Sequence, residues 1–545
     1  MKRALLWLAV MNIALQIPWS LHDDFAPLRL LAPVGELVLL AVAVACWPRR
    51  GGWLLAAGWL GLMLIEIDRL VGIYLMGQDP LFYDQLFLIR HLLVLASDLW
   101  TPSWAADMLG ILAATAASLW LLGHAVRGAR RLQAPRPTLA VLGVVALLGL
   151  LPASVRPVRW ISPEVGRNVH ESVTVWWGVN QSPEDSPHQE HAAVSLARRP
   201  DVQLYIVESY GRVLATSPLT QQDWLDNMDA LEAGLSAAGW QSASAWSTAP
   251  VSGGRSWLAD ASVLLGMPIY HESVYRHLMT RMEPLPDLVE FFDDNGYRTV
   301  RVAPKDRARP GVALTNDLRF GQQVTFKDLD YRGPPLGWGW IPDQFSLGHV
   351  AENVLDGPPL FLLFHMVTSH YPWTAPPPIL DEWRSLELLD GGVPLAERSV
   401  GAQTRHQLRR YKRRAKTRVS RGTADGLTLS DYARTIEYDL EILRRHLTET
   451  APRDALVIIM GDHQPPLVYK GGTMDVPVHV LSRDPLLLDE LLDQGFTPGM
   501  AIEPGGPTAL RHEGFFSLLV RALARCCSDS DTLPAYLPAG TPAHP

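Results

Sequence analysis

The stretch Leu204-Tyr-Ile-Val-Glu-Ser-Tyr-Gly211 decides the fold, because an apolar run ends there abruptly in a carboxylate. Residues 204–207 predict a strand that is buried on both faces. Glu208 follows at the carboxyl end of this strand, which is where α/β sheets place their ligands. The stretch therefore predicts an α/β sheet with a functional side chain at the tip of a strand.

Two further apolar runs end in the same way. Residues 455–460 lead into Gly461-Asp462-His463, and residues 359–367 lead into Thr368-Ser-His370. One such strand would be structural in most proteins. Three in one chain, each ending in metal-binding or proton-transfer residues, predict a hydrolytic or transfer site that uses a metal.

The first third of the chain differs in composition from the rest. The chain has 545 residues, more than one domain needs, and its net charge of −8 does not suggest a nucleic-acid partner. Five apolar blocks have about the length that a helix needs to cross a bilayer, the last one marginally. They are residues 4–20, 28–47, 53–76, 105–126 and 138–153.

Residues 80–99 carry charges among apolar residues, which favours an amphipathic helix at the membrane surface. With five spans and the amino terminus inside, the basic residues of the loops fall on one side, as the positive-inside rule requires. These residues are Lys2, Arg3, Arg49, Arg50, Arg127, Arg130, Arg131 and Arg136. This topology predicts a multi-pass membrane protein whose residues after 154 lie on the outer side of the cell membrane.

The remaining chain divides by composition. Residues 154–200 predict a linker, residues 201–520 an α/β catalytic domain, and residues 521–545, rich in Pro and Ala, a disordered tail. Of the three cysteines, Cys526 and Cys527 are adjacent, so the domain does not rest on a disulfide framework. The predicted fold class is a multi-span α-helical membrane domain followed by an α/β domain.

Residues 398–421 hold ten Lys or Arg and no Asp or Glu. Such a run fits a solvated insertion. It also fits a contact with anionic lipid headgroups or an anionic glycan, since each basic residue near such a surface adds about 1 kcal/mol. The sequence leaves both interpretations open.

Glu208, Asp462 and His463 together offer two carboxylates and an imidazole. This set suits one divalent metal, Mn²⁺ or Zn²⁺, and less well Mg²⁺. Each residue alone would fit a capped turn or a surface ion pair. Their arrival at the ends of predicted strands favours a metal site.

The candidate nucleophile lies in Ser252-Gly-Gly-Arg-Ser256-Trp-Leu-Ala-Asp-Ala-Ser262. The two glycines free the backbone for a close approach, and Ser256 opens a predicted helix over residues 257–265, where the helix field favours a phosphate. A serine at this position also fits a simple N-cap. Contact with a metal would lower the pKa of the hydroxyl and make it nucleophilic without a histidine base.

Four segments, in this order, resemble the alkaline phosphatase superfamily, and within it the membrane-bound sulfatase-like branch of lipoteichoic acid synthases and phosphoethanolamine transferases. They are Ile206-Val-Glu-Ser-Tyr-Gly211, Gly254-Arg-Ser256, Thr368-Ser-His-Tyr-Pro-Trp373 and Gly461-Asp-His463. The resemblance implies an α/β alkaline-phosphatase-like domain. The segment at 368–373 looks most like the synthases.

The resemblance also implies roles for single residues. Glu208, Asp462 and His463 match the family's metal ligands. Ser256 matches its catalytic threonine, which also touches the metal, and His370 matches a substrate-binding histidine that we assign a catalytic role. Arg307 is the match for the family's substrate-binding arginine, whereas the tryptophan that the family has beside it is absent here. Trp338 or Trp340 fits either an aromatic wall for the substrate or a packing role.

Two departures from the family shape the prediction. The nucleophile is Ser rather than Thr, and the residues after it lack the Cys/Ser-x-Pro-x-Arg pattern of true sulfatases. The low cysteine content differs from the phosphoethanolamine transferases, which the resemblance describes as often disulfide-bonded.

The sequence thus predicts an enzyme that moves phosphoglycerol or phosphoethanolamine from a phospholipid donor to a glycan or lipid acceptor through a covalent intermediate on Ser256. Phosphoglycerol is favoured by the synthase-like segment. A phosphodiesterase or phosphatase that uses water as the acceptor, and a non-catalytic binding module, remain as alternatives.

Overall fold

The computed structural model divides the chain into two compact units, residues 1–176 and 177–545. The described residues are 2–22, 30, 32–46, 51–76, 79–85, 159–179, 188–280, 285–307, 318–335, 340–371, 373, 376–389, 424–452, 454–466, 473–530 and 532–542.

Four helices make up most of the described part of the first unit: α1 (Lys2–His22), α2 (Gly35–Cys46), α3 (Gly51–Met76) and α7 (Ser162–Val179). Helices α1, α2 and α3 lie where the first three spans are predicted. Charged residues interrupt α3 between positions 66 and 69, and Glu66 there pairs with Arg159 at 2.8 Å. No described helix has both the length and the apolar content that crossing a bilayer requires. The predicted spans 105–126 and 138–153 lie outside the described residues.

The described part of residues 154–200, predicted as a linker or wrapping segment, contains the 18-residue helix α7 and the short helix α8 (Gln189–Ala192). The inner face of α7 is partly polar, which hid its periodicity in the sequence. Asn168 Oδ1 accepts a hydrogen bond from the Phe82 amide at 2.9 Å, and Ser172 Oγ accepts one from the Tyr83 amide at 3.2 Å.

The second unit is built on one nine-stranded sheet with the order β4-β3-β5-β1-β6-β7-β2-β8, in which β9 pairs with β2. Strands β4, β3, β5, β1 and β6 are parallel, whereas β7 is antiparallel to both β6 and β2. The strands are β1 (Asp201–Val207), β2 (Gln241–Thr248), β3 (Arg298–Ala303), β4 (Gln322–Thr325), β5 (Leu360–Met366), β6 (Ala455–Gly461), β7 (Asp475–Ser482), β8 (Thr497–Pro498) and β9 (Thr508–Arg511).

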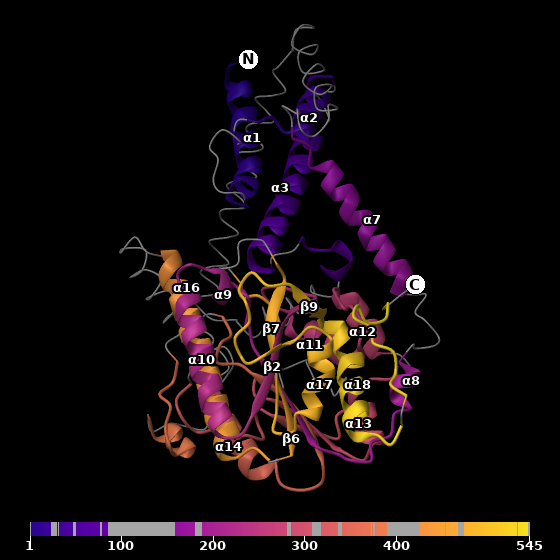
Figure 1. Ribbon diagram of the computed structural model, residues 1–545. Coiled ribbons are helices and arrows are strands. Elements are labelled where there is room, and N and C mark those ends of the chain that lie inside the picture. Colours follow the sequence, from indigo (N-terminus) through magenta and orange to yellow (C-terminus); the bar gives the residue numbers. More distant parts are fainter. Residues whose placement is uncertain are drawn as a thin grey trace. The chain divides into compact units, whose positions relative to one another are not determined.

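Helices cover both faces of this sheet, as Figure 1 shows. One face carries α10 (Gln221–Ala237), α14 (Asp343–Asn353) and α16 (Ala424–Glu449). The other face carries α11 (Ser256–Leu265), α13 (Leu288–Asp294), α17 (Leu486–Asp493) and α18 (Phe515–Cys527). Two short helices, α9 (Val213–Thr216) and α12 (Glu272–Met279), and 3-10 turns at Trp383–Leu389 and His512–Gly514 complete the unit. The α/β domain predicted from the sequence is confirmed.

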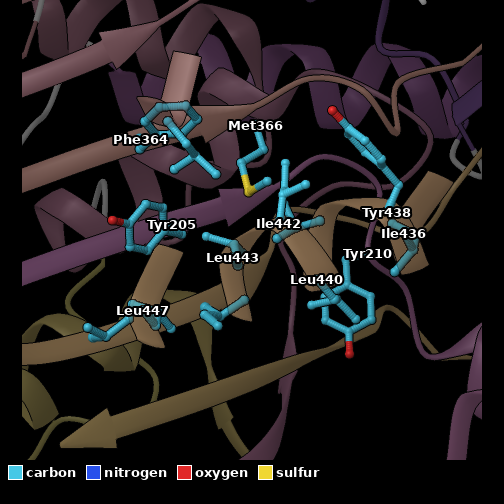
Figure 2. Close-up of a cluster of buried hydrophobic side chains, with 14 of the residues drawn as sticks. Tyr205, Tyr210, Phe364, Met366, Ile436, Tyr438, Leu440, Ile442, Leu443 and Leu447 are labelled. Atoms are coloured by element: carbon cyan, nitrogen blue, oxygen red, sulfur yellow. The ribbon is translucent and has the colours of Figure 1, made fainter. Parts of the chain in front are cut away.

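The central strands are mostly apolar because each of their faces packs against helices. In β1, Tyr205 and Val207 belong to one core, while Leu204 and Ile206 belong to the other. Figure 2 shows the first core, where Tyr205 and residues of β5 meet side chains that α16 contributes between Ile436 and Leu447. A sheet buried in this way opens to ligands only at the ends of its strands.

The prediction of a disordered tail over residues 521–545 is wrong for the residues of this range that the structure describes. Residues 521–527 complete α18, and the segment after it packs back on the domain. The Leu537 amide donates to Ser517 Oγ at 2.9 Å, and the Thr541 amide donates to the Gly266 carbonyl at 2.8 Å. Cys526 and Cys527 form a disulfide between neighbours, which joins no distant segments.

The end of β6 leaves no room for a side chain at Gly461. A Cβ built there would lie 2.0 Å from the Tyr210 carbonyl oxygen. We expect Gly461→Ala to lower the melting temperature by about 5 °C or more, because the backbone must move to relieve the clash. Gly505→Ala is the matched control, since a Cβ there meets nothing within 4 Å. Equal melting temperatures for the two variants would contradict this prediction.

Candidate active site

The three predicted strand tips meet at one edge of the sheet. Strand β1 lies between β5 and β6, and Val207 is in register with Met366 on one side and with Gly461 on the other. The residues that follow these strands, Glu208, Thr368–His370 and Asp462–His463, therefore emerge side by side. The sequence indicated each tip, and the parallel order of the strands brings them together.

A strained loop brings Ser256 to the same edge. Gly253, Gly254 and Arg255 have φ angles of 67°, 147° and 66°, and the Gly253 amide donates to the Gln464 carbonyl at 2.9 Å. A positive φ is unfavourable for an arginine, which is typical of backbone held in place at a functional site. Ser256 is the first residue of α11, and Arg255 precedes it as the N-cap.

The Ser256 hydroxyl lies against the predicted metal ligands. Its Oγ donates to Glu208 Oε2 at 3.0 Å and lies 3.4 Å from His463 Nε2. One ligand atom each from Glu208, Asp462 and His463 lies within 4.8 Å of the others, and all three residues are buried. The structure thus brings together the four residues that the sequence analysis placed around one ion.

The bonds of these side chains fit a divalent cation. Asp462 Oδ1 accepts the amides of Ser209 at 2.6 Å and His463 at 2.8 Å, whereas its Oδ2 has no hydrogen-bond partner among the described residues. His463 Nδ1 donates to the Gln464 carbonyl at 2.9 Å, which leaves the Nε2 lone pair facing Asp462 Oδ2 at 3.2 Å. A carboxylate oxygen of Glu208, Asp462 Oδ2 and His463 Nε2 all carry lone pairs. In a buried space these three atoms repel one another unless a cation lies between them.

The two carboxyl groups have opposite pKa shifts. Burial raises the pKa of Asp462, and the neighbouring Glu208 carboxylate adds to this effect. Burial also acts to raise the pKa of Glu208, but His370, Lys305 and His365 outweigh it and hold that pKa well below its usual range. Glu208 is therefore a weak base, so it cannot by itself activate the Ser256 hydroxyl.

His370 also belongs to this site. Its Nδ1 donates to the Tyr371 carbonyl, and Ser369 beside it donates from Oγ to the Glu208 carbonyl at 2.7 Å. Burial lowers the pKa of His370 to about 4, although the Glu208 carboxylate opposes this shift. The imidazole is thus neutral at pH 7, and its Nε2 is able to accept a hydrogen bond.

Sequence reasoning missed three residues that adjoin the cluster: His365, Asp260 and Lys305. His365, within β5, lies 3.4 Å from Glu208 Oε2 through Nε2 and 3.1 Å from Asp260 Oδ2 through Nδ1. Burial and Lys305 lower the pKa of His365, but the two carboxylates outweigh them and raise it to about 9. Lys305 Nζ lies 3.5 Å from Glu208 Oε2, so cationic groups line one side of the site.

The structure pairs the two predicted substrate-binding residues with each other. The Arg307 guanidinium lies over the rings of Trp340 at 3.9 Å and Phe326 at 4.3 Å. Trp340 is only 2% exposed, which suits packing and leaves little surface for a ligand. Their role in substrate binding stays a prediction, and Trp338 and residues 398–421 lie outside the described residues.

Two buried acids support the loop that carries His370. Asp343, the first residue of α14, accepts the amides of Val367 at 2.8 Å and Thr368 at 2.6 Å through Oδ2. Asp439 of α16 lies beside Asp343, and neither residue is exposed to solvent. Burial and the Asp343 carboxylate raise the pKa of Asp439 well above its usual range.

We expect Asp439→Asn to stabilise the protein at neutral and alkaline pH. The stability that protonated Asp439 contributes is present below its unfolded pKa and is lost as the pH rises through its folded pKa. An amide carries no charge, and its NH₂ is able to donate to Asp343 Oδ1, which has no partner among the described residues.

Melting temperatures between pH 5 and pH 9 check this expectation. The melting temperature should change less between pH 5 and pH 9 in Asp439→Asn than in the unmodified protein. A variant that melts lower than the unmodified protein at pH 9 would contradict it.

No protein-family profile matches the chain, and no curated protein matches its sequence. The structure matches the integral membrane lipooligosaccharide phosphoethanolamine transferase A of Neisseria meningitidis with a TM-score of 0.50 and 15% identity. This match covers 97% of the present chain and 96% of the other, and at this identity it shows a shared fold.

Two further solved structures match a smaller share of the chain. A protein in the alkaline phosphatase superfamily from Vibrio parahaemolyticus is 14% identical, with a TM-score of 0.36, and the match covers 64% of this chain and 70% of that one. A phosphoglycerol transferase of Streptococcus pyogenes in complex with sn-glycerol-1-phosphate is 13% identical, with a TM-score of 0.38 and coverages of 61% and 77%.

Proposed function

Because this chain has the fold of the alkaline phosphatase superfamily, we propose that it is a membrane-anchored, metal-dependent transferase of phospho-groups. The observation that carries the proposal is the position of the Ser256 hydroxyl, 3.0 Å from Glu208 in a buried cluster with Asp462 and His463. A nucleophile beside a cation site is the arrangement that phospho-group transfer through a covalent intermediate requires.

Glu208, Asp462 and His463 would hold one divalent ion, Mn²⁺ or Zn²⁺, with the Ser256 hydroxyl beside them. When bound, the ion would lower the pKa of that hydroxyl and offset negative charge on the substrate phosphate. Lys305 adds positive charge on the same side, which favours an anionic phosphodiester.

Two displacements at phosphorus complete the proposed reaction. In the first, the Ser256 oxygen forms a bond to phosphorus, the bond to the diacylglycerol oxygen breaks, and that oxygen takes up the proton that Ser256 loses. In the second, an acceptor hydroxyl attacks phosphoserine and the Ser256 oxygen leaves with a proton. The proton of the acceptor hydroxyl passes to the leaving Ser256 oxygen, and the His370 imidazole, held through Nδ1, would orient the acceptor by accepting a hydrogen bond from its hydroxyl.

The proposed donor is a phospholipid, the moved group phosphoglycerol or phosphoethanolamine, and the acceptor an envelope glycan or lipid. The proposed location is the bacterial inner membrane, with the catalytic domain on the periplasmic side. The apolar blocks of residues 4–153 support it, and so does the match over 97% of the chain to an integral membrane protein. A reporter active only outside the cytoplasm should work when fused after Pro545 and fail when fused after Arg130.

The full chain in detergent tests the function with phosphatidylglycerol and phosphatidylethanolamine labelled in the acyl chains. The expected result is release of labelled diacylglycerol from one of the two lipids, dependent on Mn²⁺ or Zn²⁺ and greatly accelerated by an envelope glycan extract. Mass spectrometry of the extract should then show the added phospho-group.

The rival functions give other outcomes. Diacylglycerol release that is as fast without an acceptor, with the free phosphoalcohol as product, would identify a hydrolase. A chain that releases diacylglycerol from neither lipid and retains no metal would be a binding module, and either result would overturn the proposed transferase.

A further inference from the structure

A buried carboxylate on α11 adjoins the site and takes no part in the proposed reaction. Asp260 stands four residues after Ser256, so the two side chains lie on the same face of the helix. Its Oδ2 lies 3.1 Å from His365 Nδ1, whereas its Oδ1 has no hydrogen-bond partner in the part of the chain that the structure describes. The carboxylate therefore reaches the rest of the site through His365.

His365 connects Asp260 to Lys305. On the other side of the imidazole ring, Nε2 lies 3.0 Å from Lys305 Nζ. One hydrogen lies between two nitrogens at this distance, because a hydrogen bond needs a lone pair on one of them. Whichever of the two nitrogens holds that hydrogen, the imidazole carries another on Nδ1 and donates it to Asp260.

The charge of Asp260 fixes the orientation of the imidazole ring. Burial acts to raise the pKa of Asp260, but the charge and the hydrogen bond of His365 outweigh it and hold that pKa below its usual range. An ionised carboxylate accepts hydrogen bonds and donates none, so His365 Nδ1 faces it as the donor. A ring turned over about its Cβ–Cγ bond would present carbon atoms to both partners. Asp260 thus determines where Nε2 lies.

Of the three residues in this chain of contacts, Lys305 is the most accessible to a ligand. Its side chain is 18% exposed, whereas those of His365 and Asp260 are 2% and 7% exposed. Glu208 Oε2 lies 3.5 Å from Lys305 Nζ and 3.0 Å from Ser256 Oγ. Through this shared oxygen, the Lys305 nitrogen lies within two hydrogen-bond lengths of the proposed nucleophile.

We propose that Asp260 is a positioning residue that acts through His365 to hold Lys305 toward the phosphate of the lipid donor. The inference rests on the proposed transferase function, in which the charge of Lys305 favours an anionic phosphodiester. A lysine side chain is long and flexible, so a contact that fixes its nitrogen before the donor arrives lowers the entropy lost on binding. Asp260 therefore raises the affinity for the donor without touching it.

Binding of inorganic phosphate tests this role independently of turnover. Calorimetry on the full-length Ser256→Ala protein in detergent, loaded with Zn²⁺, would measure the dissociation constant. We expect Lys305→Ala and Asp260→Ala, each added to this protein, to weaken phosphate binding about tenfold, because each removes a hydrogen bond to a charged group.

The two changes combined distinguish positioning from a purely structural role. Asp260→Ala should weaken phosphate binding less than twofold when Lys305→Ala is already present, because the group through which it acts is gone. A carboxylate that only stabilised the helix would give the same loss with and without Lys305. An equal loss in both proteins, or no loss in either, would overturn the proposal.

Asp260→Asn gives the same comparison in a protein that keeps the shape of the side chain. The amide oxygen is able to accept from His365 Nδ1, and its NH₂ takes the place of Oδ1, which has no partner among the described residues. A neutral acceptor holds the ring less strongly, so phosphate binding should weaken about threefold with Lys305 present and stay unchanged in Lys305→Ala. Any other pattern would contradict the role of Asp260, even if Asp260→Ala does not fold.

Ser262→Ala is the matched control on the same helix. Ser262 is buried, donates to the Leu258 carbonyl at 2.8 Å and accepts from the Ile269 amide at 3.0 Å. Its loss should lower the melting temperature and leave phosphate binding unchanged. If Ser262→Ala weakens phosphate binding as much as Asp260→Ala does, loosening of α11 explains the effect and the proposal fails.

Failure of the positioning role and failure of the function give different results. Diacylglycerol release by the unmodified protein reports the proposed function. In the same assay, Asp260→Ala should raise the KM for the lipid donor about tenfold, while kcat at saturating donor falls less than threefold. An unchanged donor KM in Asp260→Ala, beside normal release by the unmodified protein, would overturn the positioning role alone.

Discussion

Ser256→Ala is expected to reduce transfer by at least about 1,000-fold while leaving the fold intact. The change removes the oxygen that would form the bond to phosphorus, and among the described residues Ser252 and Ser262 cannot take its place. Ser262 is buried six residues along α11 and donates back to the Leu258 carbonyl at 2.8 Å. Ser252 lies before the strained loop, bridged to Gln464.

The stability of this variant should change little in comparison. Its only certain loss is the hydrogen bond from Oγ to Glu208, which contributes at most about 3 kcal/mol because the acceptor is charged. A melting curve shows whether the domain stays folded. Ser256→Thr, which restores a hydroxyl, should keep measurable activity and serves as the matched variant.

The covalent step gives a direct readout. Donor lipid labelled in its headgroup phosphate, added without acceptor, should leave label on a peptide that contains Ser256 in the unmodified protein and none in Ser256→Ala. Turnover close to normal in Ser256→Ala, or label on another residue, would refute the assignment of the nucleophile.

The second large effect is expected at Asp462. Asp462→Asn preserves Oδ1, which accepts two backbone amides, but it removes the negative charge beside His463 Nε2. We expect metal affinity to fall by at least about 100-fold, more than the loss typical for groups that only orient a ligand, and transfer to fall with it. Metal content of the purified protein and diacylglycerol release at several Mn²⁺ and Zn²⁺ concentrations are the measurements.

A comparison of Asp462→Ala with Asp462→Asn separates the effect on metal binding from the effect on folding. It leaves the buried amides of Ser209 and His463 without an acceptor, each at about 1–3 kcal/mol, so this variant should also melt at a lower temperature. Asp462→Asn should melt near the unmodified metal-free protein. A normal metal content together with normal activity in Asp462→Asn would exclude the predicted site.

The sequence predicts those parts of the site that follow directly from local pattern. Glu208 and Asp462 each stand immediately after an apolar run, so the end of the strand and its carboxylate are visible together. His365 was missed because it lies inside such a run, where one polar residue reads as an interruption. Its contacts with Glu208 and Asp260 arise from the pairing of β5 with β1 and the packing of α11.

Residues joined only by tertiary packing could not be predicted from the sequence. Lys305 follows β3, two strands away from β1, and its distance to Glu208 depends on the order of the sheet. Asp260 had a local signal, because it lies four residues after Ser256 on one helix face. The prediction of a disordered tail was wrong for a different reason. The backbone amides of Leu537 and Thr541 donate to Ser517 and Gly266, and amino-acid composition does not reveal such hydrogen bonds.

The burial of α11 bears on how the protein responds to heat and denaturant. Every residue of this helix except Trp257 is buried, and the helix lies in the same core as α13 and α18. Local opening requires few buried contacts, and α11 has many, so its amide hydrogens should exchange with solvent only when the whole domain unfolds. The nucleophile should therefore be as resistant as the core itself, and heating should abolish activity at the temperature where the domain melts rather than below it.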